Sequence, residues 1–93
     1  MFKINRYYDD KVMSLGFEMP DGPASVGVMA PGEYEFTPSV KEILTVTSGV
    51  MSVRLSGSDG WRDFGPGETF TAGKGQTFKA KLAANASYLC LYR

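Results

Sequence analysis

Glycine and proline interrupt this chain roughly every 8 to 15 residues, so that every regular segment must be short. The runs between these breaks are rich in Val, Thr, Tyr and Phe, which favour extended backbone. No stretch indicates a helix. The strands we predict are Met13–Phe17, Ser25–Met29, Glu33–Phe36, Glu42–Thr47, Met51–Leu55, Trp61–Phe64, Thr69–Thr71, Thr77–Leu82 and Ser87–Tyr92. Strands of this length and spacing predict an all-β fold, closed into a barrel or jelly roll that hides its edges.

The size and composition of the chain favour one small globular domain. With 93 residues, of which 43% are hydrophobic, we expect a single packed domain over residues 1–93. Ten basic residues balance ten acidic ones and occur singly, so a nucleic-acid-binding surface is not expected. No window approaches the roughly 18 apolar residues of a membrane span, and no signal peptide is evident, so we expect a cytoplasmic protein that binds no membrane. The single cysteine, Cys90, lies in an apolar run and is expected to be buried and unreactive.

Alternation along two predicted strands indicates which side chains face the interior. In the strand that ends at Leu82, the apolar residues share one parity with Phe78, so Phe78 is expected to point inward and the two lysines outward. In the strand that begins at Glu42, placing the apolar Leu44 and Val46 inward turns Glu42 inward as well. The pattern therefore predicts a carboxylate at the mouth of the barrel.

The glycines and Glu42 resemble the two signature motifs of the cupin family, in which three histidines and a glutamate bind a metal ion. Gly32, Glu42 and Gly49 fit the first motif, and the segment GETFTAGKGQTF, which ends at Phe78, fits the second. The first two histidines of the family fall within TPSVK here, and the third falls on Phe78. The chain contains no histidine, and a lone carboxylate is a weak site for Zn, Fe or Cu. We therefore expect a cupin-like β-barrel that binds no metal.

A closer resemblance covers roughly nine-tenths of the chain. The segments KVMSLGF, ASVGVMAPGEYEF, EILTVTSG and SYLCLY, with Trp61 between the last two, are similar to the small pyrimidine/purine nucleoside phosphorylases, which are single-domain cupin-fold proteins of almost this length. The resemblance implies an enzyme that cleaves purine and pyrimidine nucleosides with inorganic phosphate as co-substrate. The products would be the free base and (deoxy)ribose 1-phosphate, with broad base specificity, no cofactor and a homodimeric assembly. The alternative is a non-catalytic cupin-fold protein that binds a nucleoside or a sugar.

Phosphorolysis displaces the base from the anomeric carbon through a transition state with oxocarbenium character. Glu42 suits the sugar side of this reaction, because a carboxylate repels phosphate. It could accept hydrogen bonds from ribose hydroxyls, steady the positive charge, or protonate the departing base if the carboxyl is neutral. We favour the first of these roles. The structural alternative is that Glu42 caps a turn or pairs with a lysine.

Aromatic and basic residues supply candidates for the base and the phosphate. Stacking would tolerate many bases, because every base has a π-face. The aromatic candidates are Tyr34, Phe36, Phe78 and Tyr88. Such residues are more often core than a platform for a ligand, and Phe78 has the best case because it occupies the vacated metal position beside Glu42. Phosphate favours arginine or turn amides, and the candidates are Arg54, Arg93 and Ser48, with Arg6, Arg62 and Lys11 as further options. Strand parity places none of these inside, and a partner chain could supply the arginine.

Overall fold

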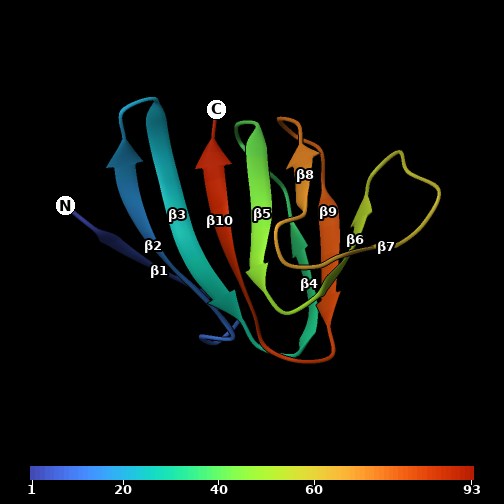
Figure 1. Cartoon of the computed structure of the whole chain (residues 1–93). Coiled ribbons are helices and arrows are strands. Elements are labelled where there is room, and N and C mark those ends of the chain that lie inside the picture. Colours follow the sequence, from blue (N-terminus) through green and yellow to red (C-terminus); the bar gives the residue numbers. More distant parts are fainter.

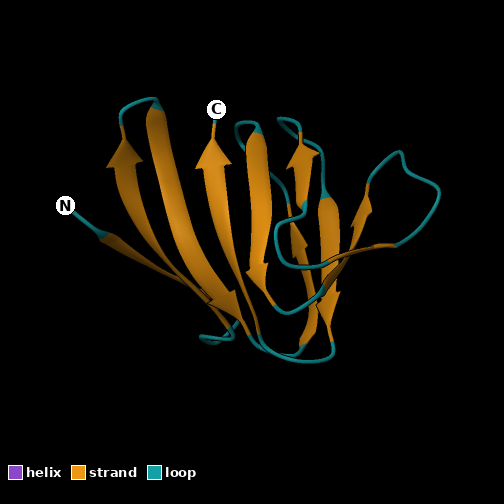
Figure 2. Cartoon of the chain, viewed as in Figure 1, coloured by secondary structure: helices purple, strands orange, loops and turns teal.

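Ten β-strands and no helix make up the structure, a computed structural model that describes all residues from 1 to 93 (Figures 1 and 2). The strands are β1 (Lys3–Tyr7), β2 (Val12–Met19), β3 (Gly22–Met29), β4 (Gly32–Phe36), β5 (Glu42–Ser48), β6 (Met51–Leu55), β7 (Arg62–Phe64), β8 (Thr69–Ala72), β9 (Phe78–Leu82) and β10 (Ala86–Tyr92). The predicted all-β fold is confirmed. No helix is present that is long and apolar enough to cross a membrane.

The strands form two antiparallel sheets that enclose the core. One sheet has six strands in the order β1-β2-β3-β10-β5-β8, and the other has four in the order β4-β9-β6-β7. In Figure 1 the larger sheet runs from the left edge through the centre, and the smaller sheet lies at the right. A cluster of 16 buried hydrophobic residues, drawn from both sheets, fills the space between them. This is the arrangement expected for a cupin-like jelly roll.

The structure confirms the side-chain directions predicted from alternation along the strands. In β9, Phe78 is buried and the two lysines that alternate with the apolar residues are exposed. In β5, Leu44 and Val46 are buried, and Glu42 lies on their side of the sheet, partly buried. Arg54 of β6 is exposed on the opposite parity. Hydrophobic burial therefore fixes the direction of Glu42, because turning it outward would expose the apolar residues that follow it.

Strand β1 is not among the predicted strands, and its pattern explains why. Its register with β2 places Lys3, Asn5 and Tyr7 on the inner face, while Ile4 points outward and is 60% exposed. The polar side chains thus face inward and the apolar one faces outward. This inverts the usual pattern, because the inner face of β1 borders a cavity and not the core.

The turn between β1 and β2 ties the two sheets together. Tyr8, Asp9 and Asp10 all have positive φ angles, of 54°, 55° and 66°. The Tyr8 hydroxyl donates a hydrogen bond to the carbonyl oxygen of Glu35 at 2.6 Å and accepts one from the Glu35 amide at 3.1 Å. Since Glu35 lies in β4, an edge strand of the smaller sheet, Tyr8 satisfies backbone groups that would otherwise lack a strand partner. The turn therefore fixes β1 and β2 against the opposite sheet.

Candidate functional site

A cavity of about 560 Å³ lies on the inner face of the six-stranded sheet. Its walls come from β1, β2, β3, β10 and β5, and Phe36 and Phe78 of the smaller sheet close it from the other side. The volume falls within the range of about 300–1,000 Å³ that is typical of small-molecule sites. The cavity can therefore hold a ligand of the size of a nucleoside.

Hydroxyl groups line the floor of this cavity, where a core-facing sheet would be apolar. Asn5 donates from Nδ2 to the Ser14 hydroxyl at 3.2 Å, and Tyr88 brings a further hydroxyl to the same cavity. A second pair, Ser25 and Tyr92, shares a hydrogen bond of 2.7 Å between β3 and β10. No buried side-chain nitrogen or oxygen lacks a partner. The floor therefore carries separate pairs of hydrogen-bonded polar side chains, which suits the recognition of a ligand rich in hydroxyl groups.

Gly27 of β3 provides the space in which the Tyr88 ring lies. A Cβ atom at Gly27 would stand 2.5 Å from both Cζ and Oη of Tyr88, which is closer than van der Waals contact permits. The ring is thus packed directly on the backbone of β3. Burial raises the pKa of the Tyr88 hydroxyl to about 12, so this group stays protonated and can both donate and accept hydrogen bonds.

Glu42 and Cys90 meet at the β5 side of the cavity. The Cys90 thiol donates to Oε1 of Glu42 at 3.6 Å, and this is the only side-chain hydrogen bond of Glu42. Burial raises the pKa of the Glu42 carboxyl, which the hydrogen bond from Cys90 partly offsets. Burial, together with the charge of Glu42, raises the pKa of the Cys90 thiol to about 12. Cys90 is buried and protonated as expected, but it also contacts the candidate catalytic carboxylate.

The structural alternatives for Glu42 are not observed. The three ion pairs in the structure involve Asp10, Glu35 and Asp21, and none involves Glu42. No turn amide donates to its carboxylate either. A partly buried carboxylate without a cation is costly unless it serves a ligand. This makes Glu42 a candidate functional residue on physical grounds as well as by motif.

Three of the four aromatic candidates line the cavity. Phe36, Phe78 and Tyr88 are part of its wall, and the centroids of the two phenylalanine rings lie 5.4 Å apart. Tyr34 does not line the cavity. It is 3% exposed, and its hydroxyl donates to the carbonyl oxygen of Ala30 at 2.7 Å, so its role is in the core. Sequence parity could not separate Tyr34 from Phe36, because both lie on the same side of β4.

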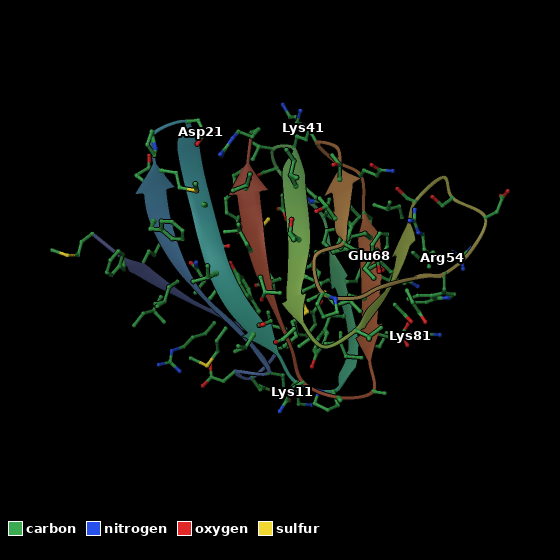
Figure 3. The ribbon with its side chains drawn as sticks, viewed as in Figure 1. Lys11, Asp21, Lys41, Arg54, Glu68 and Lys81 are labelled. Atoms are coloured by element: carbon green, nitrogen blue, oxygen red, sulfur yellow. The ribbon has the colours of Figure 1, made fainter.

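None of the candidate phosphate ligands reaches the cavity. Arg54 is exposed on β6 of the smaller sheet, on the far side of the molecule from β1 in Figure 3. Arg93 pairs with Asp21 at 3.1 Å and donates to two backbone carbonyls at 2.8 Å, which holds it at the end of β10. Ser48 is exposed and hydrogen-bonds to Ser87 away from the cavity. The further options, Arg6, Arg62 and Lys11, also lie outside the lining. Within one chain, therefore, none of these candidates lines the cavity that contains Glu42.

The cavity is also lined by polar residues that the sequence patterns do not single out. They are Lys3, Asn5, Tyr7, Ser14, Glu18, Ser25, Thr37, Ser39 and Tyr92. For Ser14 and Ser25, a small polar residue at the inward parity of an otherwise apolar strand was an available signal. Tyr92 shares the parity of Tyr88. The residues of β1 carry no such signal.

No group of three or more His, Cys, Asp or Glu side chains is arranged to hold a metal ion.

Comparison with known proteins places this chain in a family. The sequence model of the family described as pyrimidine/purine nucleoside phosphorylase matches residues 2–92. This chain belongs to the pyrimidine/purine nucleoside phosphorylase family. A family member from Pseudomonas putida (strain W619) is 50% identical over 93 residues, which cover 100% of this chain and 99% of that protein. A member from Alcanivorax borkumensis is 51% identical over 92 residues, covering 99% of this chain and 98% of that protein.

The fold of this family member is also similar to a known crystal structure. A protein of unknown function from Vibrio parahaemolyticus superposes with a TM-score of 0.93 and 36% identity, over 97% of this chain and 96% of that one. The shared fold thus covers nearly the whole chain of this phosphorylase family member. The family resemblance inferred from the sequence segments is confirmed.

Proposed function

We propose that this chain is a nucleoside phosphorylase that cleaves purine and pyrimidine nucleosides in the cytoplasm, with inorganic phosphate as co-substrate. The observation that carries the proposal is the cavity itself, in a member of this family. It combines a carboxylate without a cation, a floor of hydroxyl groups and an opposing wall of two phenylalanines. These features match a sugar, which needs polar partners, joined to a base, which needs an aromatic surface.

The proposed reaction moves one proton and exchanges one bond. The bond from the anomeric carbon to the base nitrogen breaks, and a bond to an oxygen of hydrogen phosphate forms. The base leaves with the electron pair and takes up the proton of hydrogen phosphate. Glu42 accepts hydrogen bonds from ribose hydroxyls and faces the positive charge that develops at the sugar, a form of electrostatic stabilisation by a fixed group. Phe36, Phe78 and Tyr88 contact the face of the base, which would explain broad base specificity.

No metal ion or cofactor is needed for this chemistry as we propose it. Positioning of sugar and phosphate can by itself lower the activation barrier by roughly 7–11 kcal/mol. The chain contributes no histidine, and Glu42 has only the protonated Cys90 thiol beside it, which is a poor set of ligands for a transition metal.

Release of free base that depends on phosphate is the expected result when the protein is incubated with adenosine, inosine or uridine. Chromatography should detect base and pentose 1-phosphate only when inorganic phosphate is present. Prior treatment with EDTA should leave the rate unchanged. If folded protein releases no base from any of these nucleosides, the non-catalytic alternative is favoured, and binding of the nucleosides by calorimetry would support that alternative directly. A loss with EDTA that one metal restores would contradict the metal-free mechanism.

We further propose that the enzyme is a homodimer that pairs through the outer face of the six-stranded sheet. That face exposes a group of aliphatic side chains, with Val28 at 55% and both Leu15 and Val26 at 43% exposure, next to Ile4. The charged neighbour, Arg6, is already paired with Asp10 of the same chain. Two copies can therefore meet there without burying an unpaired charge, which is the main obstacle to association.

Light scattering should give the molar mass of two chains for the native protein, and Leu15→Lys should shift the protein towards one chain. The lysine would place a charge at the centre of the aliphatic face. Lys74→Glu, a change in an exposed turn, is the matched control and should leave the mass unchanged. A native mass of one chain at micromolar concentration would refute the homodimer.

A further inference from the structure

Lys3 is the one basic side chain that lines the cavity. It takes part in none of the three ion pairs of the structure. Glu18, an acidic residue at the end of β2, also lines the cavity but is not within ion-pair distance of Lys3. An ammonium group that faces a cavity without a carboxylate partner is available to an anionic ligand.

Asn5 provides neutral donors beside this charge. Alternation along β1 places Lys3 and Asn5 on the same face, with their Cα atoms about 7 Å apart. One hydrated phosphate group can span this distance and contact both side chains. The side-chain amide of Asn5 has two N–H groups, and one of them donates to Ser14. The other remains for a ligand. Ser14 is buried, at 6% exposure, so its hydroxyl holds the Asn5 amide in a fixed orientation.

The position of Glu42 decides which end of the cavity an anion can occupy. Glu42 lies on β5 and Lys3 on β1, and three strands separate them in the sheet. A phosphate at the β5 side would meet the Glu42 carboxylate, which has no cation beside it. At the β1 side it meets the Lys3 ammonium and the Asn5 amide, although the Glu18 carboxylate of β2 lines that wall too without forming an ion pair with Lys3. We propose that inorganic phosphate binds against β1 and β2, where Lys3 supplies the charge and Asn5, oriented by Ser14, supplies a hydrogen bond. This assignment rests on the proposed phosphorolysis.

The turn that follows β1 makes this wall a defined surface. β1 is an edge strand and pairs only with β2. The Tyr8 hydroxyl attaches the end of β1 to the backbone of β4. The Tyr7 end of β1 is thus attached to the opposite sheet, which also carries Phe36 and Phe78.

Steady-state kinetics of Lys3→Met and Asn5→Ala test the subsite, with Lys74→Met as the matched control. A charge-assisted hydrogen bond typically contributes enough to change binding about tenfold. Lys3→Met should therefore raise the KM for inorganic phosphate about tenfold and leave the KM for the nucleoside within twofold of native. Asn5→Ala should also raise the KM for inorganic phosphate. Lys74→Met should alter neither constant, and circular dichroism should show that all three variants are folded.

Calorimetric titration with inorganic phosphate separates this inference from the proposed function. If the native protein cleaves nucleosides but both variants keep the native KM for phosphate, the subsite is refuted and phosphorolysis stands. If the native protein cleaves no nucleoside, phosphorolysis is refuted. In that case phosphate binding that is weakened by Lys3→Met still supports the subsite, and no binding of phosphate to the native protein refutes it.

Discussion

Replacing Glu42 with glutamine is expected to lower kcat/KM for phosphorolysis about 100-fold or more. The amide keeps the size of the side chain but loses the negative charge that faces the sugar, and positioned charges of this kind typically contribute factors of roughly 10²–10³ or more. The measurement is the initial rate of base release at saturating phosphate. Glu33→Gln, a change of an exposed glutamate in β4, is the matched control and should leave the rate near native.

The same substitution should leave the free energy of unfolding at pH 7 unchanged or should raise it. Burial raises the pKa of Glu42 above its ordinary value of 4.5, so the folded state binds the proton more tightly than the unfolded state does. The contribution of Glu42 to the free energy of unfolding is therefore fully present below pH 4.5, where the carboxyl is protonated. This contribution is lost as the pH rises through the folded-state pKa. At pH 7 the ionised carboxylate costs stability, and a neutral glutamine removes that cost.

A pH profile offers a second check on Glu42. If the carboxylate acts as an acceptor for ribose hydroxyls, activity should fall as the pH decreases through its raised pKa, and this limb should be absent in Glu42→Gln. Thermal unfolding at pH 7 completes the comparison. A variant with native kcat/KM but lower stability would assign Glu42 a structural role and contradict the proposed one.

Replacing Phe78 with alanine is expected to destabilise the fold by about 3–5 kcal/mol, as is typical when a buried phenylalanine is truncated. Phe78 is 3% exposed, and its ring lies 5.3 Å from that of Phe70 and 5.4 Å from that of Phe36. The loss would be a large share of the roughly 5–15 kcal/mol by which small domains are stable. Urea unfolding followed by circular dichroism measures it, and a change below about 1 kcal/mol would contradict a core role.

Phe78→Leu distinguishes the core role of Phe78 from stacking on the base. Leucine keeps most of the volume, so this variant should lose less stability than the alanine variant and remain folded. If Phe78 also forms the aromatic surface for the base, the nucleoside KM should rise while the phosphate KM stays native. Equal constants for the leucine variant and the native enzyme would assign base recognition to Phe36 and Tyr88.

Strand patterns in the sequence predicted much of the fold, because hydrophobic burial leaves a period of two wherever a strand covers the core. Leu44 and Val46 oriented Glu42 in this way, and Leu82 oriented Phe78. The pattern failed at β1, where the inward residues Lys3 and Asn5 face a cavity and are polar. A cavity wall does not need apolar side chains, so it leaves no hydrophobic period in the sequence.

The phosphate candidates illustrate a second limit. The geometry of arginine suits phosphate, but Arg54 lies on a solvent-facing parity and Arg93 is held by Asp21 at the end of a strand. A residue type indicates what a side chain can bind, whereas its position indicates what it can reach. The position of each side chain depends on which strands are neighbours in the sheet. Strand pairing joins segments that lie far apart in the sequence, so local patterns do not reveal it.

The sequence by itself determined the fold class, the family, the burial of Cys90 and the inward direction of Glu42, because each follows from local patterns or from segments read in order. The tertiary structure alone decided that Cys90 donates to Glu42, that Tyr88 packs on Gly27, and that β1 supplies Lys3 to the cavity. These contacts join residues from strands far apart in the chain. No local pattern encodes them, since sheet pairing and the packing of two sheets bring them together only when the whole chain folds.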